Sequence, residues 1–394
     1  MRVLSAECEA RAGATERFVR EWRDPYSWVR REARERLAGG LWSGPVIERA
    51  FDNVFSDQPD ESPRVLVGQW FGAYHASARR TLVILPGNVI GPALCAAHAV
   101  AVSGASAILK AASTERVVAE LVARQWNEIG YPLAGAIEAR YWLGGDLAAE
   151  TDAIADVDAV IAFGSDETVN AVRTRVPSDK HFIGRGTRYS LGLVTAGADL
   201  TSAADAAAVD VCMFDQAGCM SPQTIYVVGK PSRALRFAHA LDGAMRRASV
   251  RLPRMKPSND EAAAANDLLR RSYVTAMPAN SHGLSPILPG PDNGGGPDYL
   301  IVVEPQGPPR IYGFGRIVMI MPLEFGHPPV LTKSYEQVGC SCKESDGIDV
   351  DVLRALCGNA EKNTPRFVEL GRMQDAAGLP SADDFIRCAG EGNE

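Results

Sequence analysis

The sequence lacks any run of about 20 consecutive apolar residues, which is the length that an α-helix needs to cross a bilayer. Its N-terminus also lacks the unbroken apolar core of a signal peptide. Positive charge is in deficit, because 41 Lys and Arg stand against 48 Asp and Glu, for a net charge of -7. These absences argue against a membrane span and against nucleic acid as the main partner. We therefore expect a cytoplasmic protein.

A regular cysteine framework is absent too. A chain of 394 residues that is 46% hydrophobic can bury its own core, so it has little need of disulfides for its eight cysteines. Cys340 and Cys342 form a C-x-C pair, and Cys357 follows, which raises the alternative of a metal site. The paired C-x-x-C or His partners of a zinc site are missing. We therefore expect reduced structural cysteines and no metal.

Apolar patterns predict how the chain is organised. Within the first 60 residues, apolar residues recur at helical spacing, which predicts a helical lead-in. Strand-like apolar runs then alternate with helical patterns, and these runs occupy residues 81–88, 106–113, 136–145 and 158–169. Between them, the helix over 114–130 is expected to begin at a Ser or Thr and to end at Gly130. This alternation is typical of a parallel sheet with covering helices.

The same rhythm restarts after residue 197. We expect a helix over 204–214, a strand over 223–229 and a helix over 232–249, and later strands over 299–305, 315–323 and 338–344, the first two of them paired. The Pro- and Gly-dense segment 280–298 is expected to be a surface loop without regular structure. The restart indicates two α/β domains, residues 1–187 and 188–394.

The segment DQAGCMSP carries the sharpest chemical signal. It places Cys219 in a turn between a predicted helix and a predicted strand, where a thiol can face a cleft as a nucleophile. The alternative is a small buried hydrophobic residue, which is what a free cysteine usually is. The motif alone leaves both interpretations open.

Polar residues follow the predicted strands of the first domain. Asn88 in LPGNVIG is placed to donate a hydrogen bond to an oxyanion, or simply to cap the next helix. Lys110 ends the next strand, where an ammonium group can bind a ribose or phosphate. Gly164 and Ser165 form a strand-to-helix turn that suits a pyrophosphate. Neither segment is a full G-x-G-x-x-G fingerprint, so each is weak alone.

Taken in order, six segments resemble the aldehyde-dehydrogenase superfamily, and within it the luminescence-type (LuxC-like) fatty acyl reductases of bacteria. The segments are LPGNVIG, ILKAAS, YWLGGD, AFGSDETV, DQAGCMSPQ and ELGRMQ. The resemblance runs from about residue 80 to about residue 375. It implies two doubly wound α/β domains with the site between them, in which residues 1–187 bind a nicotinamide cofactor and 188–394 present the cysteine.

The resemblance also implies roles for single residues. Cys219 matches the family nucleophile and Asn88 its oxyanion donor. Lys110 matches a contact to the adenosine ribose or its phosphate, Gly164 and Ser165 match the diphosphate turn, and Glu324 falls near a glutamate on the nicotinamide ribose. Ser113 stands after Lys110 where an acidic residue would exclude a 2'-phosphate, which favours NADP(H) over NAD(H). The implied activity is reduction of an acyl thioester to an aldehyde in a homo-oligomer, with acyl-CoA, an acyl-carrier protein or an acyl-protein synthetase as donor.

Two departures from that pattern carry information. Hydrolytic members of the superfamily have a glutamate where FIGRGTRYS has Gly184, so the acyl-enzyme is expected to resist water. The segment after ELGRMQ lacks the expected His- and Trp-bearing ending, which leaves the acyl group open. Two alternatives therefore stand: a reductase of carrier-bound aryl, amino-acyl or polyketide thioesters, and a non-catalytic subunit of an acyl-transfer complex.

Overall fold

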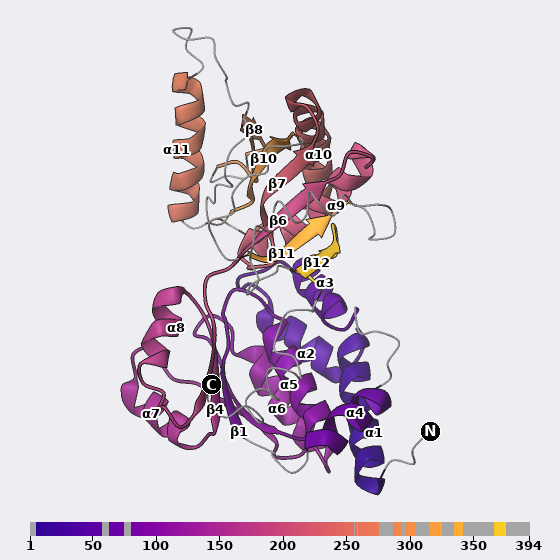
Figure 1. The fold of residues 1–394 in the computed structure, drawn as a ribbon, viewed down its shortest axis with the longest axis vertical. Coiled ribbons are helices and arrows are strands. Elements are labelled where there is room, and N and C mark those ends of the chain that lie inside the picture. Colours follow the sequence, from indigo (N-terminus) through magenta and orange to yellow (C-terminus); the bar gives the residue numbers. More distant parts are fainter. Residues whose placement is uncertain are drawn as a thin grey trace. The chain divides into compact units, whose positions relative to one another are not determined.

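The computed structural model describes residues 5–56, 63–74, 80–255, 257, 259–275, 287–292, 296–304, 315–324, 335–341 and 366–375. The chain divides into two compact units, which we call unit 1 (Met1–Thr187 with Asp375–Glu394) and unit 2 (Arg188–Gln374). Each is described by itself, and both are drawn in Figure 1. Throughout the described ranges, no helix combines the length and the apolar character that crossing a membrane requires.

Unit 1 begins with the predicted helical lead-in. Its helices are α1 (Ala6–Arg23), α2 (Trp28–Leu37), α3 (Gly44–Val54) and α4 (Pro63–Tyr74). Ser5 and Ser27 cap α1 and α2, since their hydroxyl oxygens accept backbone N–H groups of the first turn. Phe18 and Trp22 of α1 and Val29 of α2 are fully buried, as their helical spacing predicts.

The core of unit 1 is a parallel sheet in the order β3-β2-β1-β4-β5. Its strands are β1 (Arg80–Ile84), β2 (Ser106–Lys110), β3 (Ile137–Arg140), β4 (Ala159–Phe163) and β5 (His181–Arg185). The helices between them are α5 (Pro92–Ser103), α6 (Val117–Ile129), α7 (Leu147–Ala155) and α8 (Asp166–Arg173). Figure 1 shows α7 and α8 on one side of the sheet and α5 and α6 on the other. The predicted alternation of strand and helix is confirmed.

The start of α6 differs from the prediction. Arg116, not a Ser or Thr, precedes the helix, and its side chain makes no capping hydrogen bond. Instead the carboxylate of Glu115 accepts the N–H of Val118 at 2.9 Å. The hydroxyl of Thr114 is engaged elsewhere, so the buried glutamate replaces it as the cap. The predicted end is right, because Gly130 closes the helix with a φ of +85°.

Unit 2 holds a second, larger sheet in the order β12-β11-β6-β7-β10-β9-β8. Its strands are β6 (Tyr189–Val194), β7 (Pro222–Val228), β8 (Ile287–Pro289), β9 (Leu300–Val303), β10 (Ile317–Leu323), β11 (Tyr335–Cys340) and β12 (Arg366–Glu369). All neighbours run parallel except β8 and β9. The predicted pairing of the strands over 299–305 and 315–323 is confirmed as β9 beside β10.

Helices lie on both faces of this sheet. They are α9 (Leu200–Cys212), α10 (Pro231–Arg251) and α11 (Asn259–Thr275), and a short 3-10 turn, η2 (Met213–Gln216), follows α9. Figure 1 shows α10 and α11 on opposite sides of β10. Ala265 of α11 packs with Leu300, Val302 and Ile317 of the sheet. Helix α11 is not among the helices predicted from the sequence.

The expectation of an irregular loop over 280–298 is wrong at two places. Residues 287–289 form β8, which pairs antiparallel with β9 at the edge of the sheet. An edge strand tolerates Pro289 because one side of its backbone needs no ladder hydrogen bond. At the other end of the segment, Asp298 is buried and contacts Arg316. A high proline and glycine content therefore did not exclude structure there.

We predict that Phe18→Ala lowers the free energy of unfolding by about 3–5 kcal/mol. Phe18 is fully buried, and its ring meets those of Phe55 and Trp126 edge-on at centroid distances of 6.0 and 5.8 Å. Tyr26→Ala is the control, since Tyr26 is 84% exposed and its loss should change little. Urea denaturation measures both, and equal midpoints for the two variants would contradict the assigned core.

Candidate functional site

The predicted polar residues of unit 1 gather at one edge of its sheet. Asn88 follows β1, Lys110 is the last residue of β2, and Gly164 follows β4 directly. Because β2, β1 and β4 are parallel neighbours, their carboxyl ends meet at the same edge. Ligands of open α/β sheets bind outside that edge. The structure therefore brings these three positions together.

The loops after β1 and β2 are tied to each other. The hydroxyl of Thr114 donates to the carbonyl oxygen of Gly87 at 2.9 Å, and the N–H of Leu85 donates to the carbonyl of Lys110 at 3.0 Å. A Cβ atom on Gly87 would lie 2.0 Å from Oγ1 of Thr114, so this close approach needs glycine. The exposed Asn88 is thus carried on a turn whose backbone is held in place.

Lys110 is half-buried at this edge. Its Nζ lies 5.7 Å from the centroid of the Trp142 ring, and burial lowers its pKa while the charge of Glu150 opposes the decrease. Ser113 is exposed in the loop that follows. An ammonium group beside an aromatic ring suits an anionic or ribose-bearing ligand.

Gly164 and Ser165 form the strand-to-helix turn predicted for a diphosphate, but this turn is occupied by protein contacts. The hydroxyl oxygen of Ser165 accepts the N–H of Thr168 at 3.2 Å as the cap of α8. The carboxylate of Asp166 accepts the N–H of Thr187 at 2.8 Å, and a second acid, Glu167, follows it. Two carboxylates at a helix N-terminus disfavour another anion. The diphosphate role of this turn therefore stays a prediction.

In unit 2, Cys219 is exposed in the turn that runs from Phe214 of η2 to the start of β7. The turn begins with three consecutive non-glycine residues in the left-handed region: Phe214, Asp215 and Gln216 have φ values of 52°, 51° and 66°. Each such residue costs on the order of 1 kcal/mol. Strain of this kind persists only where the surrounding contacts hold it.

Polar side chains hold the far side of the same turn. The hydroxyl of Ser190 donates to the carbonyl oxygen of Cys219 at 2.7 Å, and the amide of Gln374 donates to the hydroxyl of Ser221 at 2.9 Å. The side chain of Gln216 donates to the carbonyl of Pro222 at 2.8 Å. The backbone on both sides of Cys219 is therefore anchored to buried groups, although the residue itself is exposed.

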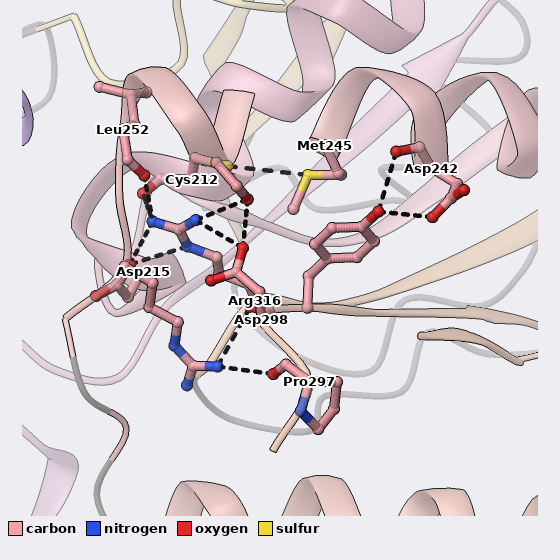
Figure 2. Close-up of polar contacts among 11 residues, drawn as sticks. Cys212, Asp215, Asp242, Met245, Leu252, Pro297, Asp298 and Arg316 are labelled. Atoms are coloured by element: carbon pink, nitrogen blue, oxygen red, sulfur yellow. Dashed lines mark hydrogen bonds and ion pairs between the residues drawn. The ribbon is translucent and has the colours of Figure 1, made fainter. Parts of the chain in front are cut away.

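Asp215, at the start of the turn, belongs to a buried ion cluster (Figure 2). Arg316 is completely buried, and its guanidinium contacts Asp215 at 2.7 Å and Asp298 at 3.5 Å. Burial raises the pKa of Asp215, and the positive charge of Arg316 opposes that rise. None of these three residues stands out in the sequence as a functional candidate, because they lie far apart in the chain and form no motif.

Glu324, which the resemblance places on the nicotinamide ribose, lies at the opposite end of the unit 2 strands from Cys219. Cys219 precedes β7, whereas Glu324 follows β10, and these two strands run parallel with Val228 opposite Leu323. At about 3.3 Å per residue, the length of β7 separates the two edges by roughly 20 Å. The structure does not bring Glu324 and Cys219 together, and the role of Glu324 stays a prediction without support from the topology.

The segment predicted to lack a hydrolytic glutamate contains no acid at all. Gly184 lies in β5, and residues 180–198 include neither Asp nor Glu. A Cβ atom on Gly184 would lie 2.6 Å from Cγ1 of Val169, so a side chain there would collide with α8. No carboxylate from this stretch is available to activate water.

The cysteines of the described residues differ in exposure. Cys8, Cys212 and Cys340 are buried, whereas Cys219 is exposed. Burial raises the pKa of Cys212 to about 11 and that of Cys95 to about 12. The thiolate is the reactive form of cysteine, so these two thiols are poor nucleophiles. Cys219 is the strongest candidate among them.

The C-x-C pair is only partly described. Cys340 is buried in β11, while Cys342 and Cys357 lie outside the described residues. Within the ranges that the structure describes, no cluster of three or more His, Cys, Asp or Glu side chains could hold a metal ion. The absence of a metal therefore stays a prediction.

Comparison with known proteins identifies the family. The sequence model of the family described as acyl-CoA reductase (LuxC) matches residues 73–279, which is just over half of the chain. The chain belongs to the LuxC family. That match covers β1 to α11, including Asn88, Lys110 and the Cys219 turn.

Two relatives of this LuxC-family chain are named long-chain acyl-protein thioester reductases. The one from Photorhabdus laumondii is 27% identical over 201 residues, covering 50% of this chain and 42% of the relative. The one from Photorhabdus luminescens is 31% identical over 160 residues, covering 40% and 33%. The chain thus spans less than half the length of the curated relatives it matches.

Solved structures establish the fold. An NAD-dependent benzaldehyde dehydrogenase from Corynebacterium glutamicum superimposes with a TM-score of 0.68 at 14% identity, covering 95% of this chain and 83% of that one. An NAD-dependent aldehyde dehydrogenase from Sinorhizobium meliloti gives 0.63 at 15% identity, with 92% and 74% covered. The predicted aldehyde-dehydrogenase-like α/β fold is confirmed.

We predict that iodoacetamide at pH 8 modifies Cys219 at least about tenfold faster than Cys8, Cys95, Cys212 or Cys340 in the folded protein. The reason is that Cys219 is exposed, while burial hinders access to the others or suppresses their ionisation. Peptide mass spectrometry over time measures the rates, with urea-unfolded protein as the control for intrinsic reactivity. Modification of Cys95 or Cys212 before Cys219 would contradict the assignment.

Proposed function

We propose that this protein reduces an acyl thioester to an aldehyde, with NAD(P)H as reductant and an acyl group carried on Cys219. The observation that carries the proposal is an exposed thiol on a strained, anchored turn in a chain of the LuxC family. The names of the matched relatives, long-chain acyl-protein thioester reductases, agree with this reaction class.

In the proposed first step, the thiolate of Cys219 attacks the thioester carbonyl and the donor thiol leaves. The negative charge that develops on the carbonyl oxygen needs hydrogen-bond donors. We assign this role to the side-chain amide of Asn88 and to a backbone N–H near Cys219. The held turns that carry both residues support the assignment, because preorganised donors need no rearrangement during the reaction.

We assign the nicotinamide cofactor to the carboxyl edge of the unit 1 sheet. The half-buried ammonium of Lys110, the ring of Trp142 and the exposed Ser113 fit a ribose or its phosphate, and the lack of an acid at Ser113 favours NADP(H). When bound, the cofactor supplies the hydride that reduces the acyl group. We keep Gly164 and Ser165 as the diphosphate turn of this assignment, although the two acids after Ser165 disfavour an anion there.

The acyl-enzyme must persist until it is reduced. Water attacks a thioester efficiently only when a base directs it, and residues 180–198 offer no carboxylate for this purpose. After reduction, the hemithioacetal on Cys219 collapses, which releases the aldehyde and returns the thiolate. The missing acid therefore favours a reductase over an aldehyde oxidase that makes free acid.

The acyl donor is proposed as a class. It is an acyl-CoA or an acyl group held on a carrier protein or acyl-protein synthetase, taken up by a cytoplasmic homo-oligomer. Because the chain covers less than half of its curated relatives, a panel of acyl-CoAs and acyl-carrier proteins has to define the acyl group. If NADPH is consumed only with carrier-bound aryl, amino-acyl or polyketide thioesters, and not with fatty acyl donors, the protein is instead a reductase of natural-product biosynthesis.

We predict that Cys219→Ala abolishes aldehyde formation, with at least about a thousandfold loss, because no covalent intermediate can form. Binding of NADPH should stay within about threefold of the parent. Cys212→Ala is the matched control, since this buried thiol should contribute little to turnover. NADPH consumption with the best thioester of the panel measures both variants, and aldehyde production that survives in Cys219→Ala would refute the assignment.

We predict that Lys110→Met weakens NADPH binding by about 10- to 100-fold, as the loss of one charge-assisted hydrogen bond implies. Isothermal calorimetry on the protein without substrate measures this directly. Lys230→Met, which removes a lysine in front of α10 in unit 2, is the control and should bind normally. Unchanged affinity in Lys110→Met would contradict its role, and failure of the parent to bind either nicotinamide cofactor would favour a non-catalytic subunit.

A further inference from the structure

We propose that Arg316 is a positioning residue for Cys219, because it fixes the backbone of the turn that presents the thiol. The proposal rests on the proposed function, in which Cys219 accepts an acyl group. Arg316 precedes β10 at its amino end, and Cys219 precedes the neighbouring parallel strand β7. Both residues therefore belong to the same edge of the unit 2 sheet.

Two consecutive residues hold Asp215 by its backbone and by its side chain. The N–H of Gly315 donates to the carbonyl oxygen of Asp215 at 3.1 Å. The Nε and Nη2 atoms of Arg316 both reach Oδ1 of the same aspartate, at 2.9 and 2.7 Å. Asp215 is the middle residue of the left-handed run, so this clamp acts on the strained part of the turn.

The guanidinium makes further hydrogen bonds beyond those to Asp215, as Figure 2 shows. Its Nη2 donates to the carbonyl oxygens of Leu252 and Cys212 at 2.8 and 3.3 Å, which lie at the ends of α10 and α9. Its Nη1 donates to the hydroxyl of Ser249 at 3.2 Å. Arg316 therefore links the side chain of Asp215 to the carboxyl ends of α9 and α10.

A mainly stabilising role does not account for this choice of residue. An arginine that is completely buried loses its hydration, and well-packed apolar residues often replace a buried ion pair without loss of stability. An apolar side chain could fill the space, but it could not hold the carboxylate and two carbonyl oxygens in fixed directions. Only two residues separate Gln216, the last left-handed residue, from Cys219, so a change in the run moves the thiol.

The cluster offers a matched pair of variants. Asp215 and Asp298 both pair with Arg316, and both are poorly exposed, but only Asp215 belongs to the Cys219 turn. Asp298 contacts Arg316 and Ser249 on the other side of the guanidinium. Asp215→Asn and Asp298→Asn each remove one negative charge without changing the shape of the side chain. Asp215→Asn also keeps a residue type that tolerates the left-handed conformation.

The experiment compares these variants and Arg316→Lys with the parent in two measurements. The first is amide hydrogen exchange in the peptide over 213–221. The second is the rate at which octanoyl-CoA, or the best thioester of the panel, acylates Cys219. We expect Asp215→Asn and Arg316→Lys to exchange at least about fivefold faster and to be acylated at least about tenfold more slowly at saturation, with little change in the half-saturating concentration. Asp298→Asn should stay within about twofold of the parent in both.

A lower melting temperature shared by all variants, with equal exchange and acylation rates, would overturn the proposal, since this is the result of a merely structural cluster. Equal effects of the two aspartate variants on acylation would overturn it too. If the parent protein is never acylated at Cys219, the proposed function fails, and the exchange measurement still decides whether Asp215 clamps the turn.

Discussion

A guanidinium without access to water must find all of its partners inside the protein. Arg316 meets this constraint by binding Asp215, Asp298 and the carbonyl oxygens that end two helices. These partners come from segments far apart in the chain, so one buried charge fixes several of them at once. The left-handed run before Cys219 is one of these segments. In the proposed positioning role of Arg316, the position of the exposed thiol therefore depends on a buried ion pair.

The two units contribute different chemistry to the proposed reaction. Unit 2 presents a thiol on a held turn, and unit 1 gathers an amide, an ammonium group and small residues at the carboxyl edge of its sheet. The stretch over 180–198 lacks the acid that would direct water against an acyl group. These features together favour an acyl-enzyme that resists hydrolysis until it is reduced. Membership of the LuxC family agrees with such a reduction.

The sequence was informative where a local pattern determines the structure. Apolar runs predicted β1, β2, β4 and β7, because a buried parallel strand needs a continuous apolar segment. The turn around Cys219 was found for a similar reason, since small residues and Ser-Pro mark it in one short segment. The edge strand β8 was missed because Pro289 and the prolines and glycines around it in the sequence are typical of loops.

Long-range polar contacts could not be predicted. Arg316 lies 101 residues from Asp215, and no periodicity or motif links them, so only the folded chain shows that they pair. The topology does not support the predicted role of Glu324 at the nicotinamide ribose, for a related reason. A short motif does not tell which end of a strand faces the site. Asn88 and Lys110 follow or end parallel neighbouring strands, as the apolar runs before them predicted, so both lie at the carboxyl edge of the sheet.

The most direct test of the account is the lifetime of the acyl group on Cys219. Intact-protein mass spectrometry after incubation with acyl thioesters and without NAD(P)H would follow it, and peptide mapping would locate it. The account predicts one acyl group per chain, on Cys219, that persists for minutes in water and disappears when NADPH is added. Rapid hydrolysis to the free acid, or an acyl group on another residue, would contradict it.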